Sequence, residues 1–148
     1  MATQFSVTFD CSDPDRLTSF WADALGYKLK DPPAGFDDWL AYFRHIGVPE
    51  EGLQGATAVY LVDPEGVGPQ LFFQEVPEGK VVKNRLHLDL HVGGGRDVPL
   101  ATRRKRVDAE ADRLVGAGAT KLHVSDEATV DHYFVVLQDP EGNEFCLR

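Results

Sequence analysis

Residues 86–92, LHLDLHV, alternate between apolar and polar side chains. Successive side chains of a strand point to opposite faces, so this pattern predicts a strand with leucines on one face and His87, Asp89 and His91 on the other. Residues 5–11, FSVTFDC, have the same alternation near the start of the chain. The leucine and phenylalanine faces are expected in a hydrophobic core. The question is what the polar faces meet.

The two halves of the chain repeat one order of patterns. Each alternating strand precedes an amphipathic helix pattern, predicted at 14–25 and about 100–116. Asp13 is a good N-cap, Pro14 suits the first helical position, and Gly26 is placed to end the first helix in a left-handed conformation. Further strands are expected at about 27–30, 57–62, 70–75, 121–125, 133–137 and 144–147. The turn Asp-Pro-Glu-Gly occurs in both halves, at 63–66 and 139–142.

We therefore predict a single domain built from two copies of a strand–helix–strand–strand–strand unit. Module one covers about 1–76, a charged linker covers about 77–84, and module two covers about 85–148. Residues 31–55 are an insertion rich in turn residues that contains Trp39, Tyr42 and Phe43. These aromatic side chains either form a satellite cluster that folds the insertion onto the domain, or serve as an aromatic lid.

Each unit has one helix to cover its sheet, so the opposite face of each sheet is left polar or mixed. The fold class expected is α+β: two βαβββ modules that pair edge to edge into a curved eight-stranded half-barrel with the helices outside. The polar faces would then line a shared concave cup. Concave sites with a few convergent polar groups are the usual places for small ligands.

Composition narrows the possible partners. The 148 residues carry a formal net charge of −9, which argues against nucleic acid or an anionic membrane as a partner. The sequence contains no apolar run of transmembrane length and no signal segment, so a cytoplasmic location is expected. Cys11 and Cys146 lie far apart and are read as free thiols in a reducing compartment. The basic run at 103–106 is interpreted as a solvated helix face rather than a nucleic-acid patch.

The paired units with their Asp-Pro-Glu-Gly turns resemble the vicinal oxygen chelate superfamily, which holds glyoxalase I, bleomycin-resistance proteins and extradiol dioxygenases. More closely, residues 68–92 and 139–147, GPQLFFQEVPEGKVVKNRLHLDLHV and DPEGNEFCL, resemble glyoxalase-like proteins of actinobacteria. The most specific part runs from Phe73-Gln74 through Lys83-Asn84-Arg85 to His87-Leu88-Asp89. The resemblance implies a small-molecule cup and a homodimer.

In metal-dependent members, the resemblance implies His or Glu ligands from the first and last strands of each unit. The matching positions here are Ser6, Phe72, His87 and Cys146. A hydroxyl is a poor ligand and a phenyl ring is none, so His87 and Cys146 alone remain, below the three ligands typical of a catalytic zinc. His87, Asp89 and Cys146 form an alternative trio that is not inherited. We expect no cofactor, with a divalent metal as the alternative.

Three functions remain open at this point. The first is a small-molecule binder without the inherited metal site, which we favour. The second is an enzyme of lyase, isomerase or dioxygenase type that uses His87 and Asp89, and the third is an interaction protein with a vestigial cup. The ligand-binding residues expected are Ser6, Thr8, Trp39, Phe72, Gln74, His87, Asp89 and Cys146. His91, His123 and His132 are expected at the surface without a role.

Overall fold

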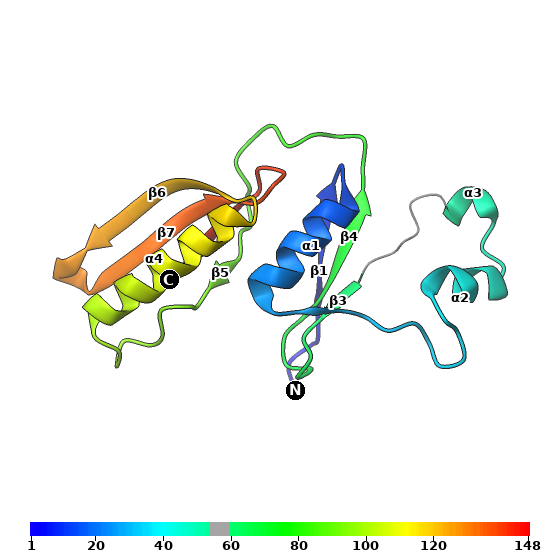
Figure 1. The fold of residues 1–148 in the computed structure, drawn as a ribbon, viewed down its shortest axis with the longest axis horizontal. Coiled ribbons are helices and arrows are strands. Elements are labelled where there is room, and N and C mark those ends of the chain that lie inside the picture. The colour runs from blue at the N-terminus through cyan, green and yellow to red at the C-terminus, as the bar shows by residue number, and fades with distance from the viewer. Residues whose placement is uncertain (54–59) are drawn as a thin grey trace. The chain divides into compact units, whose positions relative to one another are not determined.

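The computed structural model describes residues 1–53 and 60–148, except for the side chain of residue 128 (Figure 1). The chain forms two compact units, Met1–Gly79 and Lys80–Arg148. The boundary between the units falls inside the predicted linker 77–84. The pairing of the two units into one half-barrel stays a prediction.

Unit 1 contains one four-stranded mixed sheet with the strand order β1-β4-β3-β2. The first strand runs parallel to the last, and the other pairs are antiparallel. Its elements are β1 (Ser6–Cys11), α1 (Pro14–Leu25), β2 (Lys28–Leu29), α2 (Trp39–His45), α3 (Glu50–Leu53), β3 (Tyr60–Val62) and β4 (Gln70–Glu75).

Unit 2 repeats this plan with the strand order β5-β8-β7-β6, and again its first strand is parallel to its last. Its elements are β5 (Asp89–Leu90), α4 (Leu100–Gly116), β6 (Thr120–Glu127), a short 3₁₀ helix η1 (Ala128–Val130), β7 (His132–Gln138) and β8 (Glu144–Leu147). The predicted α+β class and the repeat of two βαβββ units are therefore confirmed. Neither described sheet closes into a barrel.

Helix α1 forms for the reasons that its sequence indicates. The side chain of Asp13 accepts a hydrogen bond from the Arg16 amide at 3.0 Å, Pro14 opens the helix, and Gly26 ends it in the left-handed conformation at φ 65°. The buried face of the helix packs on the sheet (Figure 1), where the Trp21 ring lies 5.1 Å from that of Phe9. Phe9 in turn stacks on a ring of β4, so this sheet face is the core of unit 1.

Helix α4 covers one face of the unit 2 sheet (Figure 1). Val107, Ala111 and Leu114 are fully buried, as the helical spacing predicts. The helical spacing also predicts Val115 on this face, but Val115 is 43% exposed, because it lies in the last turn at the edge of the apolar stripe. Fully buried side chains of β7 and β8 face this helix: Val135, Leu137, Phe145 and Leu147.

The interpretation of the basic run 103–106 as a solvated helix face is wrong for Arg103, whereas Lys105 and Arg106 are exposed. Arg103 is only 8% exposed and forms an ion pair with Asp131. Arg104 pairs with Asp126, and Arg106 donates a hydrogen bond to the Gly93 carbonyl at 3.1 Å. The run lies in the first half of α4, whose N-terminal end meets the loops around β5 and η1. Three of its four cations therefore tie the helix to its own unit.

Three further expectations need correction. Phe5 and Leu86 were expected in the core but are 70% and 74% exposed. Phe5 lies one residue before β1, and Leu86 lies three residues before β5. Neither residue therefore has a paired neighbour on the parallel partner strand. One helix is expected in each unit, yet the insertion 31–55 forms two further short helices, α2, capped by Asp38, and α3. Residues 54–55 of the insertion and 57–59 of the predicted third strand lie outside the described residues.

The two Asp-Pro-Glu-Gly turns have the same internal structure. Asp63 accepts hydrogen bonds from the amides of Glu65, Val67 and Gly68, and the first glycine of the turn, Gly66, has a positive φ of 70°. Asp139 accepts from the amides of Glu141 and Asn143 and from the Asn143 side chain. Asp139 is buried, at 2% exposure, so its amide donors have few alternative partners in water.

The difference in burial between Asp139 and Asp63 gives a test of what each carboxylate contributes to its turn. Replacing Asp139 with Ala leaves partly buried amides without an acceptor and should lower the free energy of unfolding by about 2 kcal/mol. The matched change Asp63→Ala, in the more exposed turn, should cost less than about 1 kcal/mol because water replaces the carboxylate. Urea denaturation of both variants measures the difference. Equal losses would contradict the role of burial.

Candidate functional site

A hollow of about 380 Å³ opens on the face of the unit 2 sheet that α4 leaves uncovered. Side chains along β7 alternate: Tyr133, Val135 and Leu137 are buried toward the helix, while the residues between them point the other way. The hollow is lined by Lys83, His87, Asp89, His132, Phe134, Val136, Glu144, Cys146 and Arg148. Apolar side chains of β7 form its floor, and charged side chains stand at its edge.

Asp89 is the polar centre of this hollow. Its carboxylate lies 3.0 Å from Nδ1 of His87 and 3.5 Å from Nη1 of Arg148. The parallel register pairs Asp89 directly with Cys146, so the thiol stands next to the carboxylate. Ligand atoms of His87, Asp89 and Cys146 all lie within 4.8 Å of one another. The structure thus brings together the trio that the sequence indicated.

The chemistry of Cys146 follows from these neighbours. Burial raises the pKa of the Cys146 thiol, and the negative charge of Asp89 together with a hydrogen bond to it raises this pKa further. The thiol is therefore protonated near neutral pH. A protonated thiol is a weak nucleophile and must lose its proton before it can bind a metal.

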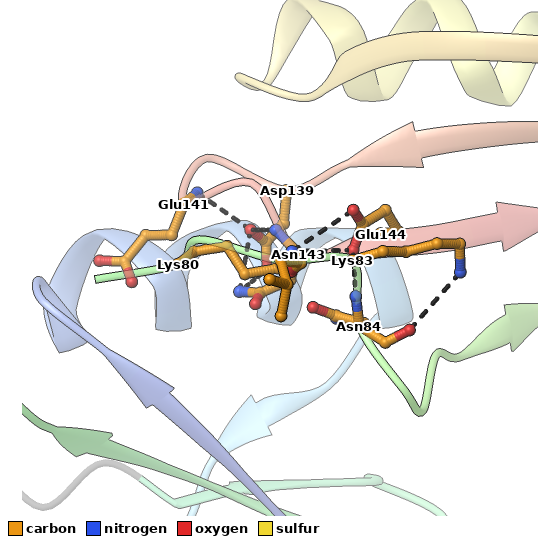
Figure 2. A network of polar contacts seen from close by, with 8 residues as sticks. Lys80, Lys83, Asn84, Asp139, Glu141, Asn143 and Glu144 are labelled. Atoms are coloured by element: carbon orange, nitrogen blue, oxygen red, sulfur yellow. Dashed lines mark hydrogen bonds and ion pairs between the residues drawn. The ribbon is translucent and has the colours of Figure 1, made fainter. Parts of the chain in front are cut away.

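The chain that leads into His87 is anchored by Glu144 of β8 (Figure 2). The Glu144 carboxylate accepts a hydrogen bond from the Asn84 amide at 2.9 Å and pairs with Lys80 at 3.2 Å. Its side chain is only 11% exposed. The Asn84 amide above all, with help from Lys80, lowers the pKa of Glu144 to about 2. Glu144 thereby fixes residues 80–84 against β8, three residues before His87.

The remaining predicted ligand contacts lie in unit 1. Ser6, Thr8 and Gln74 are exposed on β1 and β4, and the register pairs Thr8 with Phe72. These positions match those of unit 2, since Thr8 and Phe72 occupy the places of Asp89 and Cys146 in the repeated topology. Unit 1 thus has hydroxyls and a phenyl ring where unit 2 has possible metal ligands. Their role as ligand contacts stays a prediction.

Trp39 belongs to an aromatic cluster of unit 1. Its indole N–H donates to the Lys30 carbonyl at 2.9 Å, and its ring lies 5.8 Å from that of Tyr60. Tyr60 in turn stacks on Phe72 with ring centroids 4.9 Å apart. Tyr42 and Phe43 pack against Trp39 on the same helix. These contacts favour the satellite cluster that folds the insertion onto the unit, over the lid.

Sequence reasoning missed part of the hollow. His132 was expected at the surface without a role, but it is half-buried, lines the hollow and lies 4.9 Å from the Phe134 ring. His91 is exposed and stands at the wall of a second, neighbouring pocket. The alternation of residues 132–138, HYFVVLQ, carried a signal: it places His132, Phe134 and Val136 on the face away from α4.

Comparisons with known proteins agree with this architecture. The model of the glyoxalase-like domain family matches residues 6–148. Among the curated proteins, none matches the chain in sequence. Among the described residues, no helix is long and apolar enough to cross a membrane.

Solved structures with the same fold share little sequence with this chain. A variant of the fosfomycin resistance protein FosX from Listeria monocytogenes, in complex with Mn(II) and 1S,2S-dihydroxypropylphosphonic acid, has a TM-score of 0.62 at 11% identity, covering 100% of this chain and 90% of that one. A glyoxalase/bleomycin resistance protein/dioxygenase family enzyme from Burkholderia phytofirmans PsJN has a TM-score of 0.57 at 18% identity, covering 96% and 94%. The hypothetical protein SA1046 from S. aureus has a TM-score of 0.57 at 15% identity, covering 99% and 96%.

The anchoring role of Glu144 predicts a pH dependence. Because its pKa is lowered on folding, its contribution is complete above its ordinary pKa of 4.5 and is lost as the pH falls toward about 2. In Glu144→Gln, the free energy of unfolding should therefore fall less over this pH range than in the wild type. Urea denaturation at pH 7, 4 and 3 measures it. Glu78→Gln, at an exposed position, is the control and should show the pH dependence of the wild type. If the free energy of unfolding of Glu144→Gln also falls with pH as steeply as that of the wild type, the anchoring role of Glu144 is refuted.

Proposed function

The chain belongs to the glyoxalase-like domain family, and on that basis we propose that it binds a small molecule in the hollow of unit 2, without the metal site of its metal-dependent relatives. The hollow of about 380 Å³ carries the proposal, because small-molecule sites are concave, mostly apolar and of this size. Phe134 and Val136 offer an apolar floor. His87, Asp89 and Arg148 offer polar groups that orient a ligand.

The chemistry of the side chains supports binding over inherited metal catalysis. Two of the four positions that hold metal ligands in metal-dependent relatives are Ser6 and Phe72 here. A third, Cys146, is a thiol whose pKa is raised by burial and by Asp89. The His87–Asp89 pair needs no metal to act, since it can hydrogen-bond a polar group of the ligand or exchange a proton with it.

A residue that fills the hollow tests the proposal. The probes are neutral small molecules, such as phenol, benzyl alcohol and cyclohexanol, in a thermal-shift assay. A probe present at about ten times its Kd should stabilise the wild type by roughly 1.4 kcal/mol, or a few degrees in Tm. Val136→Trp should abolish this shift while the protein stays folded, because Val136 lies on the open face of the sheet.

Val124→Trp is the matched control. Val124 is 43% exposed, lies on the neighbouring strand β6 and pairs with Val135, so it belongs to the opposite face of the sheet. This variant should keep the response of the wild type to each probe. An unchanged response in Val136→Trp would place the binding site outside the hollow.

A second candidate is a metal-assisted enzyme of lyase, isomerase or dioxygenase type. The observation that favours it is the cluster of His87, Asp89 and Cys146, with ligand atoms within 4.8 Å of one another. The neighbour FosX was solved with Mn(II), but a set of imidazole, carboxylate and thiolate suits zinc better than manganese, which prefers oxygen. Zinc held by these three residues would supply a Lewis acid or an activated water.

Metal analysis separates the two candidates. Under the binding proposal, protein purified without added metal contains no stoichiometric zinc, and added Co(II) produces no thiolate-to-cobalt absorption band. One zinc per chain that disappears in His87→Ala and Cys146→Ser would favour the enzyme instead. Cys11→Ser is the control for the thiol, because Cys11 is buried in unit 1.

A further inference from the structure

A second pocket of about 250 Å³ in unit 2 shares His132 and Arg148 with the hollow. It lies where the end of β5, the loop before α4 and the start of β7 meet. The pocket is lined by His91, Gly94, Gly95, Arg96, Arg103, Asp131, His132, Tyr133 and Arg148. Two residues therefore belong to both walls, so the pocket and the hollow are direct neighbours.

The charge of this pocket is opposite to that of the chain. The whole chain has a formal net charge of −9, yet three arginines and two histidines face a single aspartate here. That aspartate, Asp131, is already neutralised by its ion pair with Arg103. In the described part of the chain, Arg96 has no ion-pair partner, and Arg148 has one long contact, with Asp89 at 3.5 Å. Clustered charge of one sign in a concavity focuses the electric field and attracts the opposite charge.

The pocket is rigidly built by Arg103. Its side chain is 10% exposed, and it donates hydrogen bonds to the carbonyls of Val98 at 2.9 Å and Asp131 at 3.3 Å. Asp131 has a positive φ of 52°, a conformation that few residues other than glycine adopt, and the guanidinium holds it there. Arg103 is thus a positioning residue that joins α4 to the turn before β7.

The two glycines of the pocket wall, Gly94 and Gly95, pack closely against the next residues of their own loop. A Cβ atom at Gly95 would stand 2.5 Å from the Asp97 carboxylate, and one at Gly94 would stand 2.9 Å from Val98. In the described part of the chain, the amides of residues 94–96 donate no hydrogen bond to protein groups. Consecutive backbone N–H groups without partners form a common anion-binding element. Tyr133 is not a free donor, because its hydroxyl already donates to Asp108.

We propose that this basic pocket binds the oxyanion group of an organic acid, a carboxylate or a phosphate-type group, whose apolar body lies in the hollow. The inference rests on the proposed function and narrows the ligand class to amphiphilic anions. Arg96 and Arg148 pair with the oxyanion, and charge-assisted hydrogen bonds of this kind are about twice as strong as neutral ones.

Amide NMR titrations of the full chain at constant ionic strength test this with three probes: inorganic phosphate, benzoate and neutral benzyl alcohol. We expect saturable phosphate shifts at the amides of residues 94–96. Benzoate should bind at least about fivefold more tightly than benzyl alcohol. In Arg96→Gln, phosphate affinity should fall at least about fivefold and benzoate should lose its advantage. Arg16→Gln, the same charge change in exposed α1 of unit 1, should leave both unchanged.

The outcomes separate this inference from the proposed function. Benzyl alcohol shifts at Val136 without phosphate shifts at 94–96 would overturn the anion pocket and leave the hollow intact. Equal weakening by Arg16→Gln and Arg96→Gln would also overturn it, because the effect would be one of net charge. Phosphate binding at 94–96 without benzyl alcohol binding at Val136 would uphold the anion site and contradict the hollow.

Discussion

The parallel pairing of the first and last strands in each unit determines the rest of the structure. A parallel pair needs a long crossover, and here the crossover contains a helix that covers one face of the sheet and leaves the other open. The same pairing places Asp89 beside Cys146, residues that are far apart in sequence. The parallel pairing of β5 with β8 therefore determines the open face, its charged edge and the cluster of His87, Asp89 and Cys146. Strand β5 makes this pairing with only two residues.

His87 lies outside the hydrogen-bonded part of β5, so other interactions must hold it in place. Two act together: the ring is bound by Asp89 from the strand itself, and the chain before it is bound by Glu144 through the Asn84 amide. Figure 2 shows that this anchor adjoins the turn built around Asp139. The Asp-Pro-Glu-Gly turn thus has a consequence beyond its own geometry, because it orients the start of β8, and β8 orients the segment leading to His87.

Local patterns predicted the elements well and the contacts between elements only in part. Alternation, the Asp13 cap and the repeated turn are properties of adjacent residues, so α1, α4, β4 and β8 could be placed from sequence. The trio of His87, Asp89 and Cys146 was accessible because the repeat implied which strands pair. The burial of Arg103 could not be predicted in this way, since it depends on Asp131. Asp131 lies in a turn that no sequence periodicity connects with α4. The burial predicted for Leu86 and Phe5 failed for a related reason, because the alternation begins before the paired register, three residues before it at Leu86 and one residue before it at Phe5.

The two units show how one backbone can carry different chemistry. In unit 1, Phe72 stacks on Tyr60 and continues to Trp39, so an aromatic cluster occupies the positions that hold Cys146 and its neighbours in unit 2. At these positions, ring packing takes the place of the charged groups of unit 2 and holds the insertion against the sheet of unit 1. In unit 2, the same face holds Asp89, His87 and Arg148, and their partial burial would cost stability if the groups did not pair with one another. They do pair, and Asp89 joins His87 and Arg148 into one connected group. A change at any one of these three residues therefore alters the partners of the other two, with no movement of the backbone required.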